Sequence, residues 1–214
     1  MKKVDIAVVD YGMGNLRSVS KAIEHVAPGK VVAVTSEASV INQAERIVFP
    51  GQGAMPDCIR ELDSRGLRAA VIEATKTKPF LGVCIGLQML FERSEEGGVA
   101  GLSLLGGHVM KFAHDEMHDE AGQKLKVPHM GWNQVYQDKP HFLWTDIASG
   151  ERFYYVHSYY VKPHEANINA AHSDYPKPFT CAVAQDNLFA VQFHPEKSAQ
   201  AGLQLLSNFV HWKP

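Results

Sequence analysis

The sequence places a cysteine, Cys84, at the centre of the pentapeptide "GVCIG", between Gly82 and Gly86. Glycine–x–nucleophile–x–glycine is the pattern of a strand that turns sharply into a helix and presents the central side chain at the turn. Flanking glycines are needed there because other side chains would clash. A thiol at the start of a helix is favoured as the thiolate, which is the nucleophilic form. The alternative is a small core residue, since free cysteines are often buried and inert.

A candidate general base lies in "VQFHPEKS", where His194 and Glu196 follow a strand-like segment. A nucleophilic cysteine needs a base, and the base needs an orienting group. Residues two apart in an extended chain point to the same side, and Pro195 biases His194 towards extended geometry. We therefore expect Glu196 to hold one imidazole nitrogen while the other faces Cys84. The chain has 11 histidines, so an incidental surface turn is the alternative, but the pairing with the cysteine pattern argues against it.

A glycine-rich turn in "VFPGQGAM", formed by Gly51, Gln52 and Gly53, follows another strand-like run. Glycines leave backbone N–H groups with little steric cover. One N–H of this turn, together with the N–H of Ile85, could bind the oxyanion of a tetrahedral intermediate. The turn does not match a phosphate loop, because no Lys-Ser/Thr pair follows the glycines.

The elements that must position these residues alternate in the first half of the chain. Strand-like runs occur at "VDIAVVD", "KVVAVT", "RIVFPG" and "PFLGVC". Helical patterns follow the first run, with Asn15 as a plausible N-cap, the third run, and the fourth run from about Leu87. Strict alternation indicates βαβ units, and hence an open, mostly parallel sheet with helices on both faces. Ligands bind at the carboxyl ends of such strands.

The second half of the chain changes character. Residues 104–195 form short strand-like segments and turns, and a closing helix is expected over Ser198 to Trp212. We find no internal repeat or linker. The sequence therefore predicts a single α/β domain over residues 1–214, with a β-rich second half.

The composition is that of an ordinary globular protein, with 214 residues, 45% hydrophobic, 21% charged and a net charge of −2. The sequence has no block of Lys and Arg residues that would indicate a nucleic-acid partner. Its apolar runs are all shorter than the ~20 residues that a membrane span needs. Asp5 and Asp10 interrupt the N-terminal apolar run and no small-residue cleavage site follows, so we expect a first strand there and not a signal peptide. An odd number of cysteines favours reduced thiols and the cytoplasm, with Cys58 and Cys181 as packing residues.

A polar, acidic segment runs from Lys111 to Lys126. Its His114 and His118 are four residues apart, which is the spacing of a helical zinc motif. The H-E-x-x-H order is absent because Asp115 follows His114. We expect a solvated loop here, and neither a metal nor a cofactor in the protein.

Three motifs, "PGQGA", "GVCIGLQ" and "HPEKS", occur in an order and spacing that resemble the class I (triad) glutamine amidotransferases over nearly the whole chain. The resemblance implies a flavodoxin-like sheet. It also implies that Cys84 attacks the side-chain amide of glutamine, that His194 transfers the protons and that Glu196 orients His194. Substrate contacts follow from the same resemblance for Gln88, one helical turn beyond the cysteine, and for Ser158 and Tyr159.

More specific segments, "VDYGMGNLRSV", "VPHMGWNQV" and "YYVHSYYV", resemble one branch of this family, the glutaminase subunits of imidazole glycerol phosphate synthase in histidine biosynthesis. This resemblance implies a heterodimer with a (β/α)8 cyclase subunit. Ammonia would pass to that partner, which makes imidazole glycerol phosphate and aminoimidazole carboxamide ribotide. Candidates for the partner face, where exposed aromatic residues are expected, are Asn15, Met130, Trp132, Tyr136 and Lys197.

The branch resemblance also implies low glutaminase activity until the partner binds its ligand, with a peptide flip in the Gly51–Gly53 turn as the switch. Other functions stay open. They are a glutaminase subunit of another synthase, a γ-glutamyl peptidase or γ-glutamyl cysteine hydrolase with the same triad, and a non-catalytic regulatory subunit on this scaffold. The branch segments argue against the first, and the complete triad argues against the last.

Overall fold

The structure is a computed structural model that describes residues 3–113, 117–118 and 122–214. His114 and Asp115 of the polar segment lie outside the described residues. None of the helices in these ranges is long and apolar enough to cross a bilayer. All three cysteines are free and buried, so Cys58 and Cys181 are core residues.

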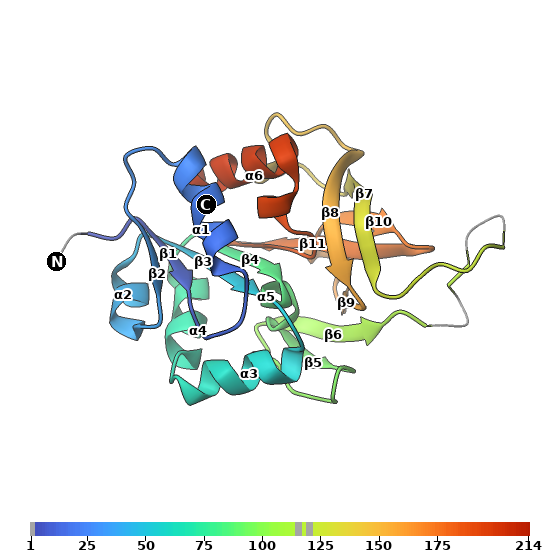
Figure 1. Cartoon of the computed structure of the whole chain (residues 1–214), viewed down its shortest axis with the longest axis horizontal. Helices are drawn as coiled ribbons and strands as arrows, with labels where there is room; N and C mark the ends of the chain where they lie inside the picture. Colours follow the sequence, from blue (N-terminus) through green and yellow to red (C-terminus); the bar gives the residue numbers. More distant parts are fainter. Residues whose placement is uncertain (1–2, 114–116, 119–121) are drawn as a thin grey trace.

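A 12-stranded mixed sheet runs through the molecule (Figure 1). The strands on one side of it are parallel, in the order β2-β1-β3-β4-β12. They are short apolar segments, largely buried on both faces, which is typical of parallel strands. Their bounds are Val32–Thr35 (β2), Ile6–Val9 (β1), Arg46–Gly51 (β3), Phe80–Cys84 (β4) and Leu188–Val191 (β12). The predicted parallel sheet is confirmed, and its fifth strand comes from the second half of the chain.

Helices cover both faces of the parallel part (Figure 1). Two helices that contact each other, α1 (Leu16–Val26) and α6 (Ala199–His211), lie on one face. The opposite face carries α2 (Ala38–Gln43), α3 (Met55–Ser64) and α4 (Arg68–Thr77). The sequence did not predict α2, because its six residues bury only Ile41 and carry too little apolar periodicity.

The second half is β-rich, as expected, and its pairing is mainly antiparallel. After β12 the sheet continues through β11, β10, β7 and β8, while β5, β6 and β9 form a branch that joins it at β11. The bounds are Pro178–Gln185 (β11), Asn169–Asp174 (β10), His129–Gln137 (β7), Glu151–His157 (β8), Phe91–Ser94 (β5), Leu105–Lys111 (β6) and Tyr159–Pro163 (β9). Three short 3-10 turns are η1 (Phe142–Trp144), η2 (Ala166–Ile168) and η3 (Pro195–Lys197).

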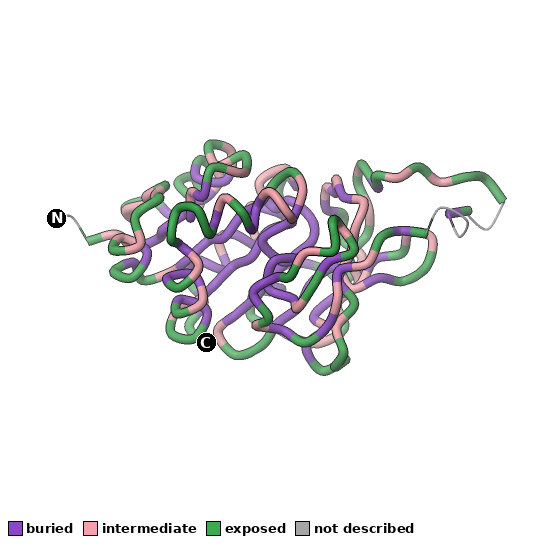
Figure 2. Tube along the Cα trace, turned by 90° about the horizontal axis from the view of Figure 1, so that it is seen from below, coloured by how far each residue is buried: buried purple, intermediate pink, exposed green. Residues whose placement is uncertain are grey.

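The helix after the cysteine differs from the prediction. It begins at Ile85, directly after Cys84, and α5 (Ile85–Gln88) ends after one turn instead of extending from about Leu87. The next residues, Met89 to Phe91, are completely buried and lead into β5. A short run that is apolar on every side cannot be assigned to a helix or a buried strand from periodicity alone. Figure 2 shows that buried residues concentrate along the centre of the molecule, whereas exposed residues lie mainly along its periphery.

Candidate active site

The turn at Cys84 has the strained geometry that the sequence predicts. Cys84 ends β4 with φ 56° and ψ −111°, a conformation that L-residues rarely adopt, and α5 begins at the next residue. Glycines are required on both sides, because an added Cβ at Gly86 would lie 1.9 Å from the carbonyl oxygen of Phe49. At Gly82 it would lie 2.9 Å from the Cβ of Ala190. The backbone therefore presents the thiol at the carboxyl end of the sheet.

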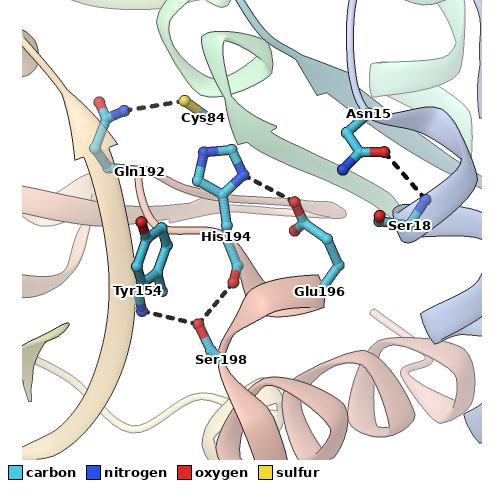
Figure 3. A network of polar contacts seen from close by, with 8 residues as sticks. All are labelled: Asn15, Ser18, Cys84, Tyr154, Gln192, His194, Glu196 and Ser198. Atoms are coloured by element: carbon cyan, nitrogen blue, oxygen red, sulfur yellow. Dashed lines mark hydrogen bonds and ion pairs between the residues drawn. The ribbon is translucent and has the colours of Figure 1, made fainter. Parts of the chain in front are cut away.

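His194 and Glu196 form a buried hydrogen-bonded pair. The Nδ1–H group of His194 donates to Oε1 of Glu196 at 2.9 Å, and the two side chains are only 5% and 3% exposed. His194 is extended, with φ −105° and ψ 96°, and Glu196 holds one imidazole nitrogen, as predicted. The extended backbone does not continue beyond His194, because Pro195 starts the 3-10 turn η3. Figure 3 shows Cys84 and Glu196 on either side of the His194 imidazole.

The backbone of His194 is held by the neighbouring strand and helix. Its N–H donates to the carbonyl of Tyr154 in β8 at 2.9 Å. Its carbonyl accepts from the Ser198 hydroxyl at 2.6 Å, and the hydroxyl oxygen of Ser198 in turn accepts from the Tyr154 N–H at 2.9 Å (Figure 3). These three hydrogen bonds hold the backbone that carries the His194 ring.

The charges around His194 favour its protonated form. Burial disfavours the imidazolium, but a Cys84 thiolate nearby and the hydrogen-bonded Glu196 carboxylate outweigh burial and raise the pKa of His194 to about 10. A thiolate beside an imidazolium is the reactive arrangement of cysteine nucleophiles.

One pocket of about 290 Å³ contains the cysteine and the histidine. Eight of the predicted catalytic and substrate residues line it: Gln52, Gly53, Cys84, Ile85, Gln88, Ser158, Tyr159 and His194. Gly51 and Glu196 are not part of its surface. Gly51 is buried and pairs with Cys84 in the β3–β4 register, which places the glycine turn beside the nucleophile.

The glycine turn is held from its inner side and open on its outer side. The Tyr11 hydroxyl donates to the Pro50 carbonyl at 2.8 Å, and the Cys58 thiol donates to the Gln52 carbonyl at 3.6 Å. Gln52 and Gly53 are exposed, and Gly53 has φ +104°. The turn therefore lies against the Cys84 pocket, where its backbone N–H groups could serve as oxyanion donors.

Two buried polar atoms at the pocket lack a hydrogen-bond partner within the described part of the chain. They are Nε2 of His194 and Oε1 of Gln88. Buried polar atoms are normally satisfied, so unsatisfied ones that line a pocket indicate where a bound molecule completes the hydrogen bonding. Gln88 is 1% exposed, so it is not an ordinary solvent-facing helix residue.

Sequence reasoning missed Gln192, which is fully buried next to the nucleophile. Its amide nitrogen donates to the Cys84 sulfur at 3.7 Å (Figure 3). Its amide oxygen accepts from Gln88 at 3.0 Å. The signal was a single glutamine inside the apolar run "LFAVQF", because a polar residue there must have a buried partner.

Glu96 was also missed. It lines the pocket, and its Oε2 accepts from the N–H of Met55 at the start of α3 at 2.8 Å. Its acidic group follows β5, a strand that the sequence did not reveal, so nothing in the local pattern placed it near Cys84.

A pair of buried histidines lies at the pocket: His157 lines it, and His129 contacts His157. His157 Nδ1 donates to the carbonyl of Tyr159 at 2.8 Å, and its Nε2 contacts Nδ1 of His129 at 2.9 Å. Burial lowers the pKa of His157 to about 3 and of His129 to about 4, so both rings are neutral near pH 7. The Tyr159 carbonyl also accepts from Gln88 at 3.1 Å. The two histidines therefore position one wall of the pocket.

Some of the residues predicted for a partner face lie close together on the surface. Met130 and Trp132 of β7 are 62% and 50% exposed. Trp132 packs edge-on to Tyr154 at 6.1 Å between ring centroids, and the Lys197 ammonium lies 5.9 Å from the same ring. Tyr136 is half-buried and stacks on His172.

Asn15, the remaining predicted partner residue, is exposed. Its side chain also accepts from the Ser18 N–H at 3.4 Å, which confirms the predicted N-cap of α1 (Figure 3). Since α1 contacts η3, Asn15 lies at the same end of the molecule as Lys197.

Comparison with known proteins agrees with this geometry. The sequence matches the class-I glutamine amidotransferase family over residues 7–212. It is 67% identical to the imidazole glycerol phosphate synthase subunit HisH of Nitrosospira multiformis, over 98% of this chain and 99% of that one. The HisH subunit of Thiobacillus denitrificans is 65% identical, over 99% of this chain and 92% of that one. A crystal structure of a glutamine amidotransferase superimposes with a TM-score of 0.71 at 13% identity, covering 96% and 97% of the two chains.

Proposed function

The chain belongs to the class-I glutamine amidotransferases, and we propose that it is the glutaminase subunit of an imidazole glycerol phosphate synthase in histidine biosynthesis. Near full-length relatives at 67% and 65% identity carry that name. The observation that supports catalysis most strongly is the set of contacts around His194: a buried carboxylate 2.9 Å from Nδ1, and an unpaired Nε2 in the pocket that holds Cys84.

In the proposed mechanism, the Cys84 thiolate attacks the side-chain amide carbon of glutamine. The amide oxygen becomes an oxyanion, bound by the N–H of Ile85 and one N–H of the Gly51–Gly53 turn. The His194 imidazolium gives its proton to the departing nitrogen, the C–N bond breaks and ammonia leaves a glutamyl thioester. His194 then takes a proton from water, the hydroxide attacks the thioester, and glutamate is released with the thiolate restored.

Substrate recognition follows from the polar groups in the pocket. Glutamine carries an α-ammonium group, and the Glu96 carboxylate is a suitable partner for it. The unpaired Oε1 of Gln88 is a second acceptor for a donor of the substrate. Ser158 and Tyr159 close the pocket on the side of β8 and β9. Neither a metal nor a cofactor has a role in this mechanism.

The ammonia is proposed to pass to a (β/α)8 cyclase subunit bound in a heterodimer. The partner face is centred on the exposed Trp132 and Met130, and it reaches His194 through Tyr154, whose backbone bonds the histidine. Contact at this face can thereby influence the catalytic residues. A flip of a peptide in the Gly51–Gly53 turn is the proposed switch of activity. The reduced, buried cysteines are compatible with a cytoplasmic location.

The function is tested by replacing the nucleophile. Cys84→Ala should abolish synthesis from glutamine when the cyclase is present, and it should spare synthesis from added ammonia, because the cyclase site is untouched. Glutamine-dependent synthesis that survives the substitution would show that Cys84 is not the nucleophile. Loss of the ammonia-dependent reaction as well would contradict a role of Cys84 that is confined to the release of ammonia from glutamine.

The partner face is tested separately with two exposed aromatic residues. Trp132→Ala should weaken binding of the cyclase subunit by roughly 30-fold or more, since a central buried Trp at an interface is worth about 2 kcal/mol or more. Phe142, which is 47% exposed and lies in η1, is the matched control. Equal effects of Trp132→Ala and Phe142→Ala in calorimetric titrations would contradict this placement of the interface.

A further inference from the structure

We propose that a second site on this chain, formed by Glu92, His108 and His164, binds one zinc ion. One ligand atom from each of the three side chains lies within 4.8 Å of the other two. None of the three lines the catalytic pocket. Imidazole nitrogen and carboxylate oxygen are ordinary zinc ligands, whereas Mg²⁺ and Ca²⁺ prefer oxygen alone.

The three side chains come from neighbouring strands of one sheet. Glu92 belongs to β5, His108 to β6, and His164 directly follows β9. β6 lies between the other two, parallel to β5 and antiparallel to β9. A strand scaffold fixes the starting positions of the ligands better than a loop would, so little chain entropy is lost on binding.

Local irregularities of the sheet direct the side chains to one place. The register of β5 and β6 shifts between Phe91 and Arg93: Gly106 and Gly107 of β6 together lie opposite the single residue Glu92, so the bulge is on β6, directly before His108. Bulges re-aim side chains and are frequent next to functional sites. On β6 the residue before the buried Gly107 is Gly106, and a Cβ there would lie 3.5 Å from Nδ1 of His164. The absence of a side chain keeps that space open.

Backbone hydrogen bonds orient two of the ligands. The N–H of Gly107 donates to Oε2 of Glu92 at 3.0 Å. The N–H of His164 donates to the carbonyl of Gly106 at 3.1 Å. Hydrogen bonds of this kind to a ligating carboxylate hold it in place and tune its affinity for metal.

Glu92, His108 and His164 form few hydrogen bonds with one another. Oε2 of Glu92 is 3.7 Å from Nδ1 of His164, too long for a hydrogen bond. Nδ1 of His108 is buried and has no hydrogen-bond partner among the described residues. The two imidazoles meet edge-on at 5.1 Å between centroids. Ligands of a tetrahedral zinc ion with bonds of ~2.1 Å are ~3.4 Å apart, so closing the site needs side-chain movements of about 1 Å. Water would occupy the fourth position.

A zinc ion here would join the strands that carry part of the catalytic pocket. β5 is followed within two residues by Glu96, and β9 begins at Tyr159, and both of these residues line the pocket. Because the ion lies away from the Cys84 sulfur, its role is to stabilise this region, and it takes no part in the reaction.

Zinc binding is measured on the Cys84→Ser chain, because a thiolate next to a histidine could itself bind zinc. Equilibrium dialysis against zinc chloride, followed by mass-spectrometric metal analysis, should give one zinc per chain. His108→Ala and His164→Ala should each weaken binding by roughly tenfold or more. The control is His118→Ala, which removes a histidine of the polar segment and should leave the affinity unchanged.

Thermal unfolding and cobalt spectra give independent readouts. Zinc should raise the Tm of the Cys84→Ser chain and leave that of the same chain with His164→Ala unchanged. Co²⁺ should give the intense visible bands of a tetrahedral site in the Cys84→Ser chain, and these bands should be lost when His164→Ala is added. If an alanine variant fails to fold, Glu92→Gln keeps the side-chain shape and should still weaken binding. Unchanged zinc affinity in the folded ligand variants, or no zinc bound by the Cys84→Ser chain, would overturn the proposal.

Discussion

Replacing Glu196 by Gln should shift the titration of His194 and slow glutamine hydrolysis. The change keeps the shape and removes a charge 2.9 Å from Nδ1. A hydrogen bond to a charged group contributes about 1.5–3 kcal/mol, and 1.4 kcal/mol corresponds to one pKa unit. The pKa of His194 should therefore fall from about 10 to about 8–9. An amide can also donate to Nδ1 and stabilise the wrong tautomer, so we expect kcat to fall by roughly 10²- to 10⁴-fold.

The assay is the pH dependence of kcat/KM for glutamine hydrolysis in the presence of the partner. The imidazolium that protonates the departing nitrogen is lost as the pH rises through the pKa of His194. The alkaline limb should therefore lie near pH 10 in the parent and about 1–2 units lower in the variant. Glu95→Gln is the matched control, because Glu95 accepts from the Lys111 N–H outside the pocket. An unmoved alkaline limb, with kcat of Glu196→Gln within about twofold of the parent, would refute the assigned role.

Two further predictions concern the scaffold. Gly86→Ala places a Cβ 1.9 Å from the carbonyl oxygen of Phe49, so it should lower the free energy of unfolding in urea by about 1–3 kcal/mol or more and inactivate the enzyme. The control is Gly106→Ala, whose Cβ has its nearest contact at 3.5 Å and should change stability by only a few tenths of a kcal/mol. Equal losses of stability in the two variants would contradict the packing argument. Stability should also fall on acidification, because the folded-state pKa values of His129, His141 and His157, about 4, 4 and 3, lie below the unfolded value of about 6.5. The unfolded chain then binds protons that the native protein does not, and the raised pKa of His194, about 10, opposes this only weakly in the same range. Between pH 7 and pH 5 the free energy of unfolding should drop by on the order of 5 kcal/mol. A flat profile in urea titrations over this range would show that these three histidines are not buried and neutral.

The sequence allowed much of the site to be predicted, because its parts follow recognisable strand ends. Cys84 and the Gly51–Gly53 turn end two parallel strands that are neighbours in the sheet, so their meeting follows from βαβ topology. His194 comes from a strand 110 residues later along the chain. Its strand β12 pairs with β4 in parallel, and only the motif pairing gave a reason to expect that.

What could not be predicted depends on contacts between distant segments. Gln192 is buried against the cysteine. Glu96 reaches the pocket from the turn that follows β5, a strand that lies where the sequence predicts a helix. The 3-10 turn at Pro195 could likewise not be predicted from the local sequence, because this turn packs against α6. The branched sheet of β5, β6 and β9, which brings Glu92 and His164 together, has no local signature at all.

The most direct test of the catalytic assignment is to find where a glutamine analogue with an electrophilic carbon at the amide position attaches. Peptide mapping by mass spectrometry should locate one adduct per chain, on Cys84, and excess glutamine should prevent it. Cys58 and Cys181 should stay unlabelled, because burial raises the pKa of their thiols to about 11 and 12. An adduct on either of those residues, or glutaminase activity that persists after stoichiometric labelling of Cys84, would contradict the account.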